Sequence, residues 1–134
     1  MCWKRGFFSR EKQTVDIRTK RIYDEPSSAD GARILVDRVW PRGVKKADAR
    51  LDDWKKELAP SKDLRKWFSH DPEKWDEFVR RYRKELLDCD AEVNDLLAIA
   101  RDYRLTLLYG ARDTEHNNAV ALKQHLDENA ESAG

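Results

Sequence analysis

Two short, continuous apolar runs separated by a long helical pattern constrain the fold of this chain more than any other feature. The first run lies in "ARILVDRVW" (32–40) and the second in "LTLLYG" (105–110). An uninterrupted apolar run indicates a strand covered on both faces, as in a parallel sheet. Residues 44–104, between the runs, carry apolar side chains at helical spacing. A connection of that length allows a right-handed parallel crossover, which predicts an α/β protein.

Three further segments complete the predicted layout. Residues 15–23 alternate between apolar and polar side chains, which predicts a strand with one wet face. Asp71 and Pro72 predict the start of a helix with one apolar stripe. A last helix is expected over residues 114–128, with Asp113 or Thr114 as its cap. Leu51, Trp54 and Leu58 have the spacing of one further helix face.

These elements predict a small three-layer α/β sandwich with a three- or four-stranded, mostly parallel sheet and about five helices. The loop between the first two strands is short for a parallel crossover, which leaves open an antiparallel pairing of those two strands. We expect a loose N-terminal arm over residues 1–14, a single domain over 15–128 and a disordered tail over 129–134. A length of 134 residues suits one domain.

The composition favours a cytoplasmic protein that contacts no membrane. Charged residues make up 40% of the chain and the mean hydropathy is −0.92. No apolar run approaches the ~20 residues of a membrane span, and the apolar patch near the start is too short for a signal peptide. The sequence leaves the oligomeric state and the role of the N-terminal arm open.

The charge is unevenly distributed along the chain. Residues 1–50 carry 13 Lys and Arg against 7 Asp and Glu, a net charge of +6, and the remainder carries 14 against 19, a net charge of −5. Such asymmetry can mark a nucleic-acid surface. The alternative is that basic and acidic elements lie beside each other in the fold, which the total of +1 favours.

Several motifs that would indicate a cofactor or a metal are missing. The five glycines stand alone, so the chain has no GxGxxG motif and no phosphate-binding P-loop. Cys2 and Cys89 have no zinc-ligand spacing, and the three histidines lie far apart in sequence. We therefore assign no metal and no cofactor.

Polar residues gather where two predicted strands end. "DRVWPRG" follows the first apolar run and "YGARDTEHNN" follows the second. Ligands of open α/β sheets collect beyond the carboxyl ends of parallel strands. If the two strands are neighbours, Arg38, Arg42 and Arg112 should converge on one anion-binding pocket, with Trp40 as a flat wall. Pro41 would stiffen the loop.

Other residues of these loops are candidates for chemistry or for ligand contact. Asp37 is a candidate general base, and the Tyr109 hydroxyl a candidate proton donor. His116 and Asn117 are candidate ligand contacts. Each also has a structural interpretation: Asp37 as an ion-pair partner of Arg38, Tyr109 as a core residue, and the other two as helix caps.

The blocks "RILVDRVWPRGVKK" and "LTLLYGARDTEHNNAVAL" resemble the YeaO-like proteins of the domain of unknown function 488 family, over about residues 17–127. The resemblance implies a compact α/β fold in small bacterial cytoplasmic proteins and no established activity, substrate or cofactor. The family's recurrent polar positions match Asp37, Arg38, Trp40, Pro41, Arg42, Gly43, Tyr109, Arg112, Asp113 and Asn117. The wider family often shows Cys-His-Arg near the last helix, where this chain has His116-Asn117-Asn118.

Three functions remain open from the sequence. The first is a pocket for a small anion, such as a phosphate, a carboxylate or a nucleotide, with the question of catalysis unresolved. The second is a nucleic-acid binding module that uses the basic first half and stacks Trp40 on a base. The third is a protein-interaction domain without catalysis.

Overall fold

The sheet has four strands, and its last strand in the chain lies in its interior. The computed structural model describes the backbone of residues 15–133 and the side chains of residues 15–130. The predicted arm (1–14) lies outside the described residues. The strands are β1 (Ile17–Arg21), β2 (Ala32–Leu35), β3 (Asp53–Trp54) and β4 (Leu105–Tyr109). Their order is β1-β4-β2-β3, and all neighbouring pairs are parallel.

This topology confirms the predicted α/β class with a parallel sheet. The antiparallel pairing that we left open for the first two strands is wrong, because β4 lies between β1 and β2 and pairs with both in parallel. Residues 22–31 therefore lead back along the sheet before β2 begins. Ten residues can span over 30 Å, more than the length of a five-residue strand.

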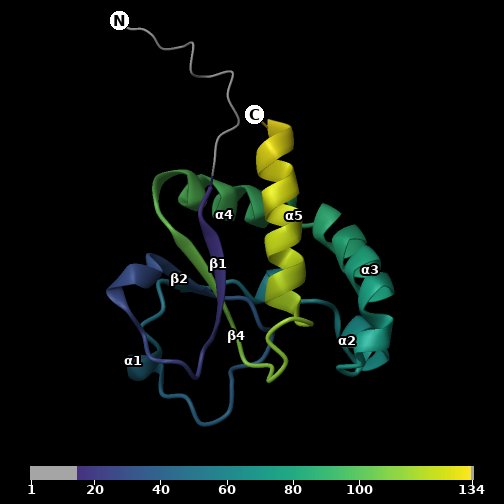
Figure 1. Cartoon of the computed structure of the whole chain (residues 1–134), viewed down its shortest axis with the longest axis horizontal. Coiled ribbons are helices and arrows are strands. Elements are labelled where there is room, and N and C mark those ends of the chain that lie inside the picture. Colours follow the sequence, from purple (N-terminus) through teal and green to yellow (C-terminus); the bar gives the residue numbers. More distant parts are fainter. Residues whose placement is uncertain (1–14, 134) are drawn as a thin grey trace, which may run out of the picture.

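Five helices are described between residues 15 and 133, and they cover the two faces of the sheet unequally. They are α1 (Lys46–Ala49), α2 (Lys62–Phe68), α3 (Trp75–Leu87), α4 (Asp90–Asp102) and α5 (Asn118–Ala133). Helix α5 contacts β1 and β4, α4 contacts β4, and α3 packs on α2 and α5 (Figure 1). The short α1 and the loop before it lie on the other face.

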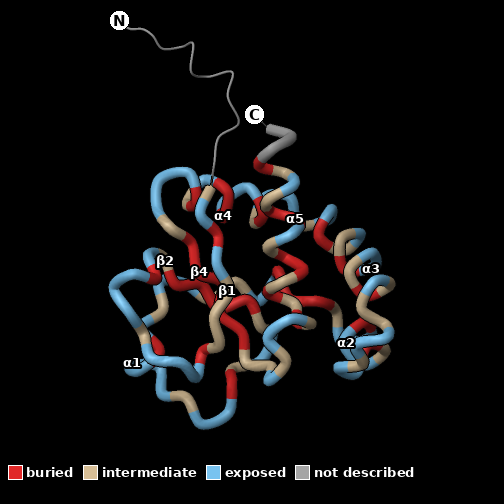
Figure 2. Tube along the Cα trace, in the orientation of Figure 1, coloured by how far each residue is buried: buried red, intermediate tan, exposed pale blue. Residues whose placement is uncertain are grey.

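The alternation of side chains along the central strands builds two apolar clusters. The central strands are buried along most of their length (Figure 2). Ile34 and Val36 join the large cluster under the helices, whereas Leu35 and Leu108 join a small cluster with Trp40 and Trp54 on the opposite face. Burial on both faces explains why these strands have continuous apolar runs.

Helix α3 follows its predicted pattern. Asp71 caps a short 3₁₀ turn by accepting a hydrogen bond from the Glu73 amide at 3.0 Å, and α3 continues from it. Phe78, Tyr82 and Leu86 on the predicted stripe are buried. The Tyr82 hydroxyl donates to the carbonyl oxygen of Leu58.

The helical prediction is wrong at two places, residues 51–58 and the start of the last helix. Residues 51–58 do not form a helix face, because Asp53–Trp54 pairs with β2: the amides of Asp52 and Lys55 donate to the carbonyls of Arg33 and Leu35. A two-residue strand depends on its neighbour and leaves almost no local pattern.

The last helix begins at Asn118 rather than at 114. Its cap is Asn117, whose side-chain oxygen accepts from the Val120 amide at 2.9 Å, and not Asp113 or Thr114. The helix runs on to Ala133, whereas we expected it to end near residue 128 and a disordered tail to follow. No helix among residues 15–133 has the length and apolar character to cross a membrane.

Gly31 and Gly43 provide a matched test of the packing before β2. Both have positive φ angles, of 67° and 80°. A Cβ on Gly31 would lie 2.2 Å from the carbonyl oxygen of Arg104, whereas a Cβ on Gly43 would meet nothing within 4 Å.

We expect Gly43→Ala to lower the free energy of unfolding by about 1 kcal/mol through φ alone. Gly31→Ala should lower it by at least about 2 kcal/mol more, because its Cβ also meets the Arg104 carbonyl. Urea unfolding measures both; equal costs would contradict this packing.

Candidate functional site

Asp37 joins the ends of the two central strands to the start of the last helix. It lies two residues after β2. One carboxylate oxygen accepts the backbone N–H of Gly110, just after β4, at 2.9 Å. The other accepts from the side-chain amide of Asn118 at 3.1 Å, and the same amide donates to the Val36 carbonyl at 2.9 Å. The two predicted loops therefore lie side by side at the carboxyl edge of the sheet.

The carboxyl group of Asp37 is largely removed from water, and this burial raises its pKa above the usual range. The hydrogen bonds from Asn118 and Gly110 oppose the shift, and so do the positive charges of Arg65 and His70. Because each oxygen already accepts a hydrogen bond, Asp37 serves as the link between three segments. The assignment of Asp37 as a general base stays a prediction.

Beside this link lies a cavity of about 570 Å³, which we call the strand-end cavity. Three segments form most of it: the loop after β2, helix α2 with the turn that follows it, and the loop that leads into α5. Its lining includes Tyr23, Asp37, Arg38, Val39, Pro41, Ala59, Pro60, Lys62, Arg65, Lys66, Phe68, Ser69, His70, Phe78, Gly110, Ala111, His116, Asn117 and Asn118.

The strand-end cavity is strongly cationic. Arg38, Lys62, Arg65 and Lys66 line it, and Asp37 is the single acidic residue among its lining residues. None of the four cations forms an ion pair with any side chain of the described region. Arg38 donates to the carbonyls of Ala59 and Pro60 at 3.2 and 3.4 Å, which holds its guanidinium near the cavity wall.

The sequence-based candidates divide into two groups of four. Asp37, Arg38, His116 and Asn117 line the strand-end cavity. Arg42, Arg112, Trp40 and Tyr109 do not line it. Although β2 and β4 are neighbours, only Arg38 of the three arginines lines this cavity; Arg42 and Arg112 are exposed and do not line it.

Trp40 is not the flat wall that we expected. Its ring packs edge-on against Trp54 at 5.4 Å, and its indole N–H donates to the Val44 carbonyl at 2.8 Å. Both contacts belong to the small cluster on the opposite face of the sheet. Tyr109 is 2% exposed within the large core, and its burial raises the pKa of its hydroxyl. A buried phenol off the cavity is not placed to donate a proton to a ligand there.

His116 reaches the strand-end cavity with a fixed ring. Its Nδ1 lies 2.9 Å from a carboxylate oxygen of Asp113, and its ring packs edge-on against Trp75 at 5.3 Å. The other Asp113 oxygen accepts the amides of Glu115 and His116 at 2.9 and 3.0 Å. These hydrogen bonds lower the pKa of Asp113. The largest effect comes from the Glu115 amide, and the next from the His116 imidazole.

Backbone strain also occurs at the rim of this cavity. Ser69 and His70, directly after α2, both have positive φ angles, of 46° and 56°. Each such non-glycine residue costs on the order of 1–3 kcal/mol and persists where the surrounding structure holds it. The turn brings His70 to the cavity that His116 also lines.

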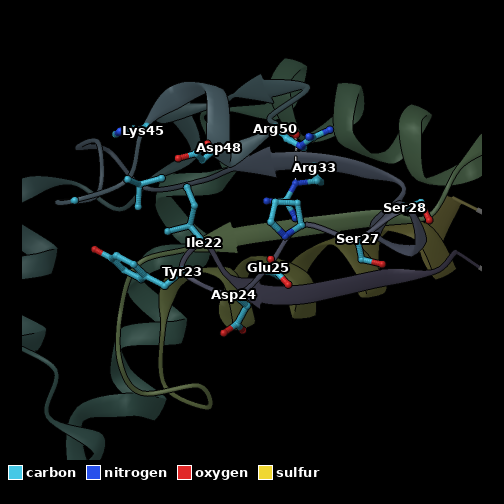
Figure 3. Close-up of a pocket in the computed structure, with 13 residues that line it drawn as sticks. Ile22, Tyr23, Asp24, Glu25, Ser27, Ser28, Arg33, Lys45, Asp48 and Arg50 are labelled. Carbon is cyan, nitrogen blue, oxygen red and sulfur yellow. Dashed lines mark hydrogen bonds between the residues drawn. The ribbon is translucent and has the colours of Figure 1, made fainter.

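A second hollow, of about 670 Å³, lies between residues 22–28 and 43–50 (Figure 3). Arg33 at its base is 4% exposed, and all three of its guanidinium nitrogens are satisfied, by Asp30 and by the carbonyls of Ala49 and Arg50. The remaining charges are of both signs, from Asp24, Glu25, Asp48, Lys45 and Arg50. This hollow lacks the uncompensated charge of the strand-end cavity.

No group of three side chains suited to hold a metal ion is found in the described part of the chain.

Comparison with known proteins identifies the family. Residues 16–134 match the family model DUF488-N3i, described as the inactive DUF488-N3 subclade. The chain belongs to this DUF488 family. It is 45% identical over 112 residues to the uncharacterized protein YeaO of Escherichia coli K12, which covers 84% of this chain and 97% of YeaO. It is 40% identical over 111 residues to the uncharacterized proteins Mb3100c of Mycobacterium bovis and MT3158 of Mycobacterium tuberculosis, covering 83% of this chain and 93% of each relative. No solved structure matches the chain.

Residues 116–118, which the resemblance sets against Cys-His-Arg in the wider family, lie at the start of α5 and directly before it. Asn117 caps the helix, Asn118 holds Asp37 and His116 contacts Asp113, so all three residues have structural partners. All three also line the cavity, and His116 is the titratable one.

Sequence reasoning missed the cations of α2 and the turn after it. Lys62, Arg65 and Lys66 fall at i, i+3 and i+4, which places them on one helix face. Leu64 and Phe68 on the opposite face are buried. That spacing was a usable signal of a cationic face, but which face of which helix closes over the strand ends is decided by tertiary packing.

Asn118→Asp tests the link at Asp37. The variant replaces a donor with an oxygen that faces a second carboxylate and leaves the Val36 carbonyl without its partner. We expect a loss of about 2 to 4 kcal/mol at pH 7. The loss should shrink as the pH falls toward about 4, because one carboxyl then takes up a proton and can donate to the other.

Asn129→Asp on the same helix is the matched control, because its amide donates to the His125 carbonyl within one helical turn. We expect it to change stability by about 0.5 kcal/mol or less. Denaturant unfolding of both variants at two pH values measures the effect. A pH-independent loss at Asn118 would contradict a carboxylate pair.

Proposed function

We propose that the strand-end cavity binds a small anionic ligand, such as a phosphate, a carboxylate or a nucleotide. The observation that carries this proposal is the group of four cations without ion-pair partners in the described region: Arg38, Lys62, Arg65 and Lys66. Like charges held together repel one another, and an anion between them relieves that repulsion. The single carboxylate of the lining already has hydrogen-bond partners on both oxygens.

Size and position also support a small-molecule ligand. Ligand pockets typically enclose about 300–1,000 Å³ and combine apolar walls with a few polar groups. The strand-end cavity has about 570 Å³, and Val39, Phe68 and Phe78 contribute apolar surface to it. It lies beyond the carboxyl ends of β2 and β4, where open α/β sheets bind their ligands.

Binding without turnover agrees best with these features. The family model that matches the chain is described as inactive. Of the two catalytic candidates from the sequence, Asp37 links three segments through its hydrogen bonds and Tyr109 is buried in the core. The nucleic-acid alternative loses its stacking residue, since Trp40 packs on Trp54 and its N–H is occupied.

Calorimetric titration with inorganic phosphate, sulfate, citrate, AMP and neutral adenosine tests the proposal. We expect at least one anion to bind and adenosine to bind more weakly than AMP. Arg65→Gln should weaken anion binding about fivefold to tenfold, because it removes one charged contact. Arg42 is exposed like Arg65 but does not line the cavity, so Arg42→Gln is the matched control and should bind like the wild type.

Two results would contradict the proposal. The first is the absence of binding for every anion. The second is an equal loss of affinity in the Arg65 and Arg42 variants, which would mean that only overall charge matters. A single-stranded oligonucleotide in the same titration separates the alternatives: strong, salt-dependent binding that survives Arg65→Gln would favour a nucleic-acid surface instead.

A further inference from the structure

The imidazole of His116 is held so that one nitrogen is occupied and the other is available. Nδ1 lies 2.9 Å from the Asp113 carboxylate, and Trp75 packs against the ring. A carboxylate accepts hydrogen bonds only, so Nδ1 carries the proton of the neutral ring and Nε2 has the lone pair. Nε2 has no hydrogen-bond partner among the described residues.

This arrangement matches the way proteins orient a histidine that contacts a ligand. A carboxylate that accepts a hydrogen bond from one ring nitrogen fixes the tautomer of the imidazole and the orientation of its other nitrogen. Asp113 also accepts two backbone amides, of Glu115 and His116, so the carboxylate itself cannot rotate away without losing them. His116 also lines the cationic cavity, so its second nitrogen is the group of the ring left for a ligand contact.

The charge state of His116 then matters for an anion in the cavity. In the neutral ring the lone pair of Nε2 opposes an anion. After a second protonation, Nε2–H donates a charge-assisted hydrogen bond to it. Asp113 on one side and the anion on the other both stabilise the imidazolium.

Other charged groups face the same space and must be separated from His116. The contact of His116 from α3 is Trp75, which is uncharged. Within its own loop, His116 follows Glu115 directly. The groups that line the cavity from the other segments are Asp37, Arg38, Lys62, Arg65, Lys66 and His70. Asp37 and His70, a carboxyl group and an imidazole, are the two competing sources of a pH effect.

We propose that His116 contacts the bound anion directly through Nε2 and that Asp113 is its positioning residue, so that anion binding is coupled to protonation of His116. The inference rests on the proposed function of the strand-end cavity. It goes further by naming the group that senses pH and the residue that orients it.

Sulfate is the probe for this coupling, because it stays a dianion across the whole pH range used. Titrations at constant ionic strength should show an affinity for sulfate about tenfold higher at pH 5.5 than at pH 8. A tenfold gain is what one added charge-assisted hydrogen bond contributes to binding. His116→Gln should bind sulfate with the wild-type affinity of pH 8 and with little pH dependence. Asp113→Asn keeps an oxygen to accept the two amides, and it should move the gain in affinity to lower pH.

Two matched variants locate the effect. His70→Gln should retain the pH dependence, and Glu115→Gln should leave both the affinity and its pH range unchanged. Loss of the pH dependence in His70→Gln, together with its survival in His116→Gln, would overturn the inference. Binding of sulfate with no pH dependence would overturn it too, while leaving the proposed function standing. Failure of sulfate to bind at any pH would overturn both.

Nuclear magnetic resonance of the imidazole nitrogens gives a second readout that a purely structural role would not move. In the ligand-free protein at pH 8, His116 should show the tautomer with the proton on Nδ1. Sulfate should shift the Nε2 resonance of His116, whereas His125, which is 7% exposed on α5, should not respond. The opposite tautomer, or an unchanged Nε2 resonance in saturating sulfate, would overturn the inference.

Discussion

The carboxylate of Asp37 is the interaction on which the candidate site depends. It accepts hydrogen bonds from Gly110 and Asn118, and so it ties the end of β2 to the loop after β4 and to the start of α5. The hydrogen bond from the Asn118 amide to the Val36 carbonyl supports the same junction. Burial disfavours an ionised carboxyl group here, and the two hydrogen bonds partly offset that cost.

The same link explains the charge of the cavity. The single acidic group of the lining is used structurally, so it does not neutralise the cations that α2 brings across the strand ends. The positive charge is built from separate segments, with Arg38 on the loop after β2 and Arg65 on α2. Each cation is individually ordinary; the uncompensated group is the property that points to an anion.

Much of the fold could be predicted from local sequence, and less of the site. The continuous apolar runs of β2 and β4 and the capped stripe of α3 are local patterns, and they gave the α/β class. Two-residue β3 and the start of α5 at Asn118 depend on contacts with other segments. At the site, the candidates Asp37 and His116 line the cavity, whereas the candidates Trp40 and Arg42 do not. The sequence could not separate the two pairs, because adjacency in sequence does not tell on which side of a loop a side chain lies.

A crystal structure of the protein soaked in selenate tests the central claim most directly, because anomalous scattering from selenium locates the anion without prior assumptions. The account predicts an anomalous peak inside the strand-end cavity, within hydrogen-bond distance of Arg65 and of Nε2 of His116 at acidic pH. Peaks confined to the exposed Arg42 and Arg112, with none in the cavity of a crystal whose packing leaves it open, would contradict it.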